Sequence, residues 1–193
     1  MASPLAVLNV SYYLTEVNGP GEFSGADLLV IDEVDSLEDE LMNYVQFSVS
    51  EKQLGRLGLS LPHDTDKLQE WLVWGDTVRL EIETRSREHQ RQLRLIPEDQ
   101  WGQPQLSQQK EVTQLKRFED KVSWFVRAFD DTWIFYLKRD EETGGREWIF
   151  KPIFISNYTD RFLWRHATQF LGMSATIFDP HIVAGTLEGR IQA

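Results

Sequence analysis

Three carboxylates follow an apolar run near the start of the chain, and their positions suggest phosphate chemistry. The run Leu-Leu-Val-Ile at 28–31 is followed by Asp32, Glu33 and Asp35. A parallel strand covered on both faces is a continuous apolar run, and ligands in open α/β sheets bind beyond the carboxyl ends of such strands. Acids at that place support phosphate-bound Mg²⁺ and activate an attacking water. The alternative is that these acids only cap a helix.

A second segment, at residues 170–180, places hydroxyl groups after another apolar run. It has the pattern of a strand, a turn that contains Ser174, Ala175 and Thr176, and the start of a helix. Asp179 suits the cap of that helix, with Pro180 at its first position. We expect Glu33 and Ser174 to lie at neighbouring strand ends of one sheet.

Together these segments resemble the XPD/DinG-type family of superfamily 2 DNA helicases. The resemblance lies in IDEVD at 31–35 and GMSATIFDP at 172–180, which match that family's motif II and motif III across a long insertion. LED at 37–39, WIFKPIFIS at 148–156 and AVLNVSYYL at 6–14 are similar to neighbouring family segments. Val34 and Asp35 stand where the family often has Ala and His, so the link to motif III is altered.

The resemblance implies a role for each residue of the two motifs. Asp32 would support Mg²⁺ indirectly, and Glu33 would activate water for attack on the γ-phosphate of ATP. Ser174 and Thr176, on either side of Ala175, would couple the nucleotide state to movement. ATP and Mg²⁺ are then the cofactors of the intact parent protein, and its partner is single-stranded DNA, followed 5′ to 3′ in a process such as DNA repair.

Two parts of such a motor are missing from the sequence. It contains no G-x-x-x-x-G-K-[ST] loop to hold the phosphates, and 17 residues after Thr176 are too few for a second motor domain. We interpret the chain as an internal helicase fragment that is inactive alone, so whether this chain is itself an enzyme stays open. The alternative is a non-catalytic, helicase-derived module for protein interaction.

The amino-acid composition excludes several kinds of site and several classes of protein. The absence of cysteine excludes disulfides, thiolate zinc sites and an iron–sulfur cluster within this segment. No apolar run approaches the length of a membrane span, and no signal peptide is evident, so we expect a cytoplasmic protein without membrane contact. The net charge of −11 predicts weak or no DNA binding by this chain alone.

The fold class expected from these patterns is α/β. Residues 1–41 and 129–193 are assigned to a partial RecA-like motor domain, and 42–128 to a mostly helical, arch-like insertion. A seam of apolar residues from Leu115 to Phe129 at spacings of three and four predicts one long helix, and residues 64–96, interrupted at Gly75, predict its antiparallel partner. Period-two segments at 132–138 and 146–152 predict a β-hairpin.

Aromatic and basic residues of the insertion have competing interpretations. Most of its aromatic residues are expected in the core, and Trp74 is the one left open. The basic residues interleave with Glu in positions suited to helix-surface ion pairs, which favours solvated helix faces. The best candidates for nucleic-acid contact share one helical face, and they are Arg87, Arg91 and Arg94.

Overall fold

The computed structural model describes residues 5–175 and shows a mixed α/β protein. The chain forms two compact units, one from residues 1–46 and 151–193 and one from 47–150. These divisions differ from the sequence-predicted boundaries at 41 and 129. The β-hairpin, assigned above to the motor domain, falls mainly in the inserted unit, because its second strand pairs with a strand at the start of that unit.

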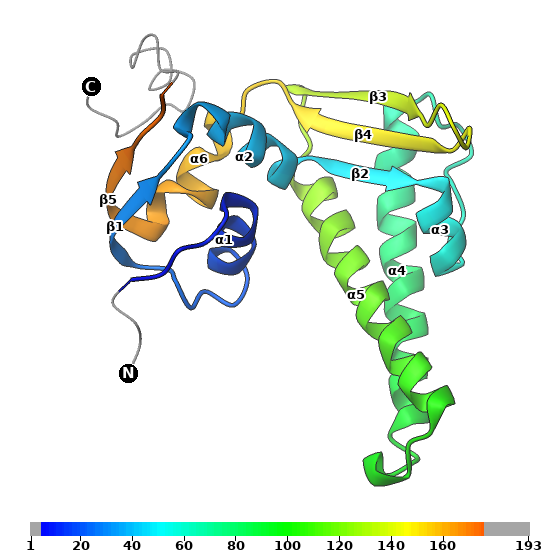
Figure 1. Cartoon of the computed structure of the whole chain (residues 1–193). Helices are drawn as coiled ribbons and strands as arrows, with labels where there is room; N and C mark the ends of the chain where they lie inside the picture. The colour runs from blue at the N-terminus through cyan, green and yellow to red at the C-terminus, as the bar shows by residue number, and fades with distance from the viewer. Residues whose placement is uncertain (1–4, 176–193) are drawn as a thin grey trace. The chain divides into compact units, whose positions relative to one another are not determined.

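The first unit is built around a pair of parallel strands. Strand β1 (Ala26–Ile31) pairs with β5 (Ala167–Gly172) from Ala26 opposite Ala167 to Ile31 opposite Gly172. Figure 1 shows this pair beside three helices. They are α1 (Val10–Val17), α2 (Leu37–Val45) and α6 (Ser156–Phe162). Short 3₁₀ turns, Val34–Ser36 and Trp164–His166, follow β1 and precede β5. Leu14, Leu37 and Leu41 are fully buried in its core.

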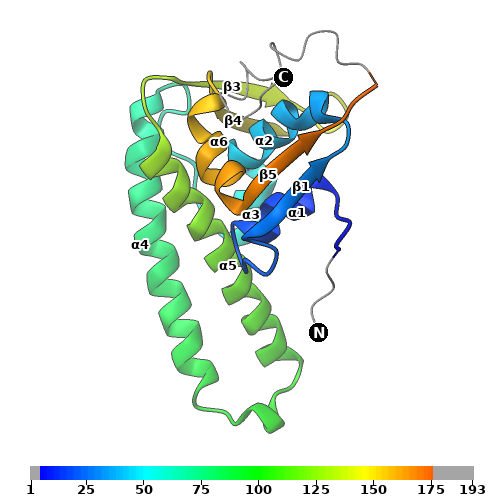
Figure 2. The same ribbon diagram turned by 90° about the vertical axis from the view of Figure 1, so that its left-hand side faces the viewer.

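The second unit combines a three-stranded sheet with a long helical hairpin. Its elements in chain order are β2 (Phe47–Ser50), α3 (Glu51–Leu57), α4 (Leu68–Leu93), the 3₁₀ turn Glu98–Gln100, α5 (Gln103–Ala128), β3 (Trp133–Arg139) and β4 (Arg146–Pro152). The sheet order is β2-β4-β3, with β2 antiparallel to β4. Helices α4 and α5 run side by side in both views (Figures 1 and 2).

The helical seam predicted from spacing is the buried face of α5. Val112, Leu115, Phe118, Val122 and Phe125 are each at most 3% exposed. Helix α4 is continuous through Gly75, the position at which the apolar pattern of its sequence is interrupted. A Cβ atom at that position would lie 2.5 Å from the side chain of Val126, so the glycine permits close approach of α5. The helix tolerates it because tertiary packing outweighs its low helix propensity.

Contacts between aromatic rings join the helical hairpin to the sheet. The Phe125 ring lies 4.6 Å from Phe47 on β2 and 4.7 Å from Phe150 on β4, measured between ring centroids. Trp74 also belongs to the core, because it is 6% exposed and its indole N–H donates to the Ser60 carbonyl at 2.6 Å. A buried, hydrogen-bonded indole is the usual state of tryptophan inside a protein.

Candidate functional site

The carboxyl ends of β1 and β5 meet, and the backbone pairing continues past both strands. The Met173 N–H donates to the Ile31 carbonyl at 2.8 Å, and the Val34 N–H donates to the Met173 carbonyl at 3.0 Å. A Cβ atom at Gly172 would lie 3.1 Å from the Val34 side chain, so glycine allows this close approach. The two segments singled out in the sequence are therefore held against each other.

Glu33 has an unusual backbone conformation at this edge. Its φ of 51° and ψ of 49° are left-handed, and it is the only non-glycine residue with positive φ among residues 5–175. Such a conformation costs about 1 kcal/mol or more and persists only where its surroundings enforce it. Here Ser36 helps to enforce it, because its N–H and hydroxyl both donate to the Glu33 carbonyl, at 2.9 Å and 2.8 Å. Strain of this kind is common at functional sites.

Ser174 brings the two motifs into direct contact. Its hydroxyl donates to the Asp35 Oδ1 at 2.7 Å, and Glu33 Oε2 lies 3.4 Å from the Ser174 hydroxyl oxygen. The expected juxtaposition of Glu33 and Ser174 is thus present, just beyond the ends of two parallel strands of one sheet. Asp35, which stands where the resembled family often has His, accepts the shorter of the two hydrogen bonds. The catalytic and coupling roles of these residues stay predictions.

Asp32 and Glu33 are exposed at the strand end, and their oxygens suit a magnesium-bound phosphate. One Asp32 oxygen accepts the Glu33 N–H at 3.0 Å, which leaves the second oxygen available. No group of three or more His, Cys, Asp or Glu residues in the described part of the chain is arranged to hold a metal. Mg²⁺ often binds through one or two carboxylates together with substrate phosphates and water, and Asp32 fits that indirect role.

The structure describes only part of the predicted motif III segment beyond Ser174. Ala175 is described and exposed. Thr176 and the expected helix start at Asp179 and Pro180 lie outside the described residues.

The predicted nucleic-acid residues share a surface at the carboxyl-terminal end of α4. Arg87, Arg91 and Arg94 line a shallow hollow of about 410 Å³ together with Gln90 and Leu95. The guanidinium of Arg87 forms an ion pair with Glu83 one turn earlier. The structure therefore brings the three arginines together, and one of them is already paired.

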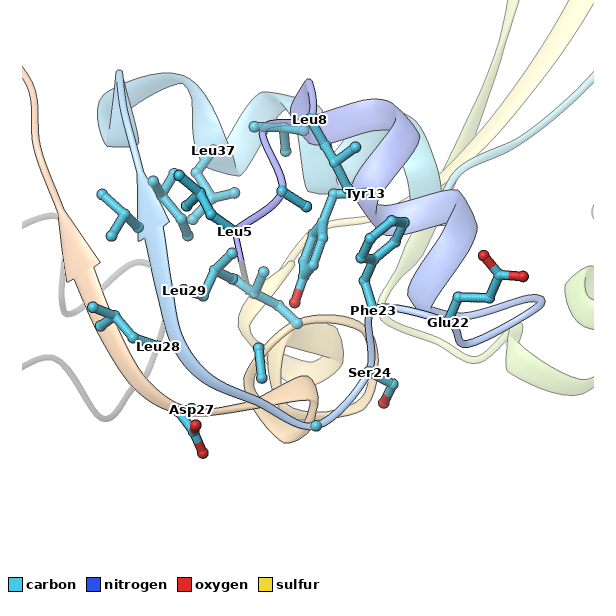
Figure 3. Close-up of a pocket in the computed structure, with 17 residues that line it drawn as sticks. Leu5, Leu8, Tyr13, Glu22, Phe23, Ser24, Asp27, Leu28, Leu29 and Leu37 are labelled. Atoms are coloured by element: carbon cyan, nitrogen blue, oxygen red, sulfur yellow. The ribbon is translucent and has the colours of Figure 1, made fainter. Parts of the chain in front are cut away.

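A larger hollow lies along β1, and sequence patterns gave no sign of it. Its volume is about 580 Å³, and it is lined by the whole strand and by residues of the segment before α1 and of α1 itself. Figure 3 shows Leu5, Leu29 and Tyr13 around it. The Tyr13 hydroxyl has no hydrogen-bond partner among the described residues, and burial, reinforced by the Glu16 charge, raises its pKa to about 12.

Side chains on the outer part of the same sheet are apolar and exposed. Leu28, Val30 and Leu171 are 50%, 46% and 49% exposed. The described sheet that carries them has only two strands, which is too few to bury an apolar face on each side. Exposed apolar patches of this kind occur at protein-interaction sites and at ligand-binding grooves.

Comparisons with known proteins leave the family open. No protein-family model, curated protein or solved structure matches this chain. No helix among the described residues is long and apolar enough to cross a membrane. The cytoplasmic location remains a prediction.

Proposed function

We propose that this chain is part of an ATP-dependent DNA helicase motor of the XPD/DinG type. The observation that carries the proposal is the contact of Glu33 and Asp35 with Ser174 at the ends of two parallel strands. A nucleotide site at such an edge matches the general placement of ligands in open α/β sheets. The coarser statement, a mixed α/β protein with a small parallel sheet, is a finding; the RecA-like motor with an arch is the proposal.

Each residue has a chemical part in this mechanism. ATP would supply the γ-phosphate, and Mg²⁺ would be the cation that neutralises its charge. Asp32 would orient the metal through its free carboxylate oxygen. Glu33 would accept a proton from the attacking water, since its carboxylate stands at the open strand end. The phosphate loop, absent from the printed sequence, would come from polypeptide outside it.

Ser174 would carry the nucleotide state towards the DNA. Its single hydroxyl proton has two acceptors at 2.7 Å and 3.4 Å, one on Asp35 and one on Glu33. When Glu33 engages water, the hydroxyl stays on Asp35, and rotation of the Ser174 side chain would exchange the acceptors. The strand end would then have two states, one for each acceptor of the Ser174 hydroxyl. Which state it adopts would depend on the bound nucleotide. Single-stranded DNA is the proposed substrate by resemblance.

The test is the ATPase activity of the complete gene product that contains this sequence. Replacing Glu33→Gln removes the proton acceptor and keeps the side-chain size, so we expect DNA-stimulated kcat to fall at least about 100-fold with ATP binding retained. Asp39→Asn, a matched loss of an exposed carboxylate on α2, is expected to leave kcat unchanged. Equal kcat for Glu33→Gln and the unchanged protein would refute the proposed role.

A second candidate function has its own observation. The hollow along β1, with the exposed side chains of Leu28 and Val30, favours a non-catalytic protein-interaction module. The two functions differ in their response to Glu33→Gln. Loss of ATP hydrolysis supports the motor, whereas a gene product that binds no ATP and loses a protein partner on Val30→Asp supports the module.

A further inference from the structure

We propose that residues 5–8, here called the N-terminal segment, pair with the outer edge of β1 as a third parallel strand. Leu5, Ala6 and Leu8 of this segment line the hollow along β1, together with the whole of that strand. Among the described residues that line the hollow, none belongs to β5, so the hollow lies at the edge of β1 that β5 leaves open. The N-terminal segment belongs to no helix or strand in the structure.

The pairing of β1 with β5 determines which backbone groups face the outer edge. The Ile31 carbonyl accepts the Met173 N–H, so the Ile31 backbone groups face β5. Because backbone groups alternate in direction along a strand, those of Leu28 and Val30 face the other way, and no hydrogen bond within residues 5–175 satisfies them. Natural sheets protect such an edge with charges or proline, or by covering it. Strand β1 has no Lys or Pro and a single charge, Asp27, so a cover is expected.

The side chains of the N-terminal segment suit this cover. Its sequence is Leu-Ala-Val-Leu, with no charge and no proline. Leu5 and Val7 are 74% and 89% exposed, and in a strand they share one face. Leu28 and Val30 likewise share one face of β1, at 50% and 46% exposed. Pairing that sets Leu5 beside Leu28 and Val7 beside Val30 removes apolar surface of all four side chains from water.

The connection to α1 makes the added strand parallel to β1. Asn9 follows the segment with an extended backbone, at φ −75° and ψ 156°, and its side-chain oxygen caps α1 by accepting the Tyr12 N–H at 2.7 Å. Figure 3 shows the segment running from Leu5 to Leu8 in the direction in which β1 runs. Residues 9–25, which include α1, then form the helical crossover that two parallel strands require.

This register assigns the hydrogen bonds of the added strand. With Val7 opposite Val30, the Val30 N–H donates to the Ala6 carbonyl, and the Ala6 N–H donates to the Leu28 carbonyl. The backbone groups of Val7 then face away from β1. The segment fills the hollow with the chain's own residues, so a partner that binds at this edge has to displace it.

The first experiment measures disulfide formation in the full chain, which has no cysteine of its own. In the double variant Val7→Cys, Val30→Cys the two Cα atoms would lie about 4.8 Å apart, within the range of a disulfide. In a glutathione redox buffer its yield should be within about twofold of that of Val30→Cys, Leu171→Cys, whose positions are opposite in β1 and β5. Val7→Cys, Leu171→Cys, about 10 Å apart across two strand spacings, should yield at least about tenfold less. Equal yields from the two Val7→Cys pairs would overturn the proposal.

The second experiment measures hydrogen exchange of the Val30 amide by NMR. Ala6→Pro removes the N–H that donates to β1, so the Val30 amide should exchange at least about tenfold faster in this variant than in the unchanged chain. Val7→Pro is the matched control, because it removes an N–H that faces away from β1, and exchange should stay within about twofold. Equal Val30 exchange rates in all three proteins would overturn the proposal.

This inference does not rest on the proposed ATPase. Glu33 and Ser174 lie beyond the strand ends, whereas the N-terminal segment pairs along the outer edge of β1. Absence of the third strand therefore does not count against ATP hydrolysis, and absence of ATP hydrolysis does not count against the third strand. Ala6 and Val7 are exposed, so both proline variants should keep the helical circular dichroism of the unchanged chain.

Discussion

At the residue scale, a buried histidine joins three segments of the first unit. His166 Nε2 lies 3.1 Å from the Asn18 side-chain oxygen, and its Nδ1 lies 2.9 Å from the Ser24 hydroxyl. The Asn18 amide group donates to the Leu14 and Phe162 carbonyls, so its oxygen is an acceptor. This assignment places the imidazole proton on Nε2 and makes Nδ1 accept from Ser24. The network is satisfied by neutral histidine.

Acid should therefore weaken the first unit. Burial, followed by the charge of Arg165, holds the pKa of His166 below its ordinary 6.5. At pH values between the folded-state and unfolded-state pKa of His166, the unfolded chain binds more protons than the folded chain. The contribution of His166 to the free energy of unfolding is therefore complete above pH 6.5 and decreases as the pH falls below that value. Urea unfolding at several pH values, monitored by circular dichroism, should show a shallower acid loss for His166→Gln.

Exposed Ser107 provides the control for this effect. Ser107→Ala removes no titratable group, so it should leave the pH dependence of the unfolding free energy unchanged. If His166→Gln and the unchanged protein lose stability equally between pH 6.5 and 5, the network does not govern acid sensitivity.

At the element scale, two helical glycines have opposite surroundings. A Cβ atom at Gly75 would lie 2.5 Å from Val126, whereas Gly55 on α3 has no neighbouring atom within 4 Å. Alanine favours helix by about 1 kcal/mol at either place, but overpacking against the stiff valine costs about 1–3 kcal/mol. Urea unfolding should show Gly55→Ala more stable by up to about 1 kcal/mol and Gly75→Ala less stable by about 1 kcal/mol. Equal stabilisation of the two variants would contradict the close packing of α4 on α5.

Sequence patterns predicted the long and strongly periodic elements best. The strand Arg146–Pro152 is predicted by its period of two, although the pattern continues to Ile155 and the strand ends at Pro152. The seam of α5 is predicted because apolar residues recur at spacings of three and four over about four turns. Helix α3 and strand β2 were not expected, since four to seven residues are too short for a period to appear. The cap of α3, formed when the Ser50 hydroxyl accepts the Gln53 N–H at 3.1 Å, was the available signal.

The candidate site was predictable only in part. An apolar run that ends in acids indicated the strand end, and a second run that ends in Ser174 indicated its neighbour. The choice of Asp35 as the nearest acceptor depends on the left-handed turn at Glu33, which no residue-type preference predicts for glutamate. The hollow along β1 depends on how a sheet and a preceding segment meet in space, which a linear pattern does not record.

At the scale of the whole molecule, the second unit has the ends of an inserted domain. Phe47 and Phe150 are opposite each other in the antiparallel pairing of β2 with β4, so the chain enters and leaves this unit at neighbouring positions. Domains with adjacent ends are the ones that insertion tolerates. The rings of Phe47, Phe125 and Phe150 contact one another within the unit, which therefore has its own core.

Residues 47–150 should consequently fold as an isolated fragment. We expect strong helical circular dichroism from α4 and α5 and a cooperative urea transition, because the core and both ends are internal to the unit. Phe125→Ala should lower its unfolding free energy by about 3–5 kcal/mol, because Phe125 is fully buried. Leu80→Ala, at a side chain 66% exposed, should change it by less than about 0.5 kcal/mol. A fragment with helical signal but no cooperative transition, and no difference between these variants, would mean that the aromatic core forms only in the full chain.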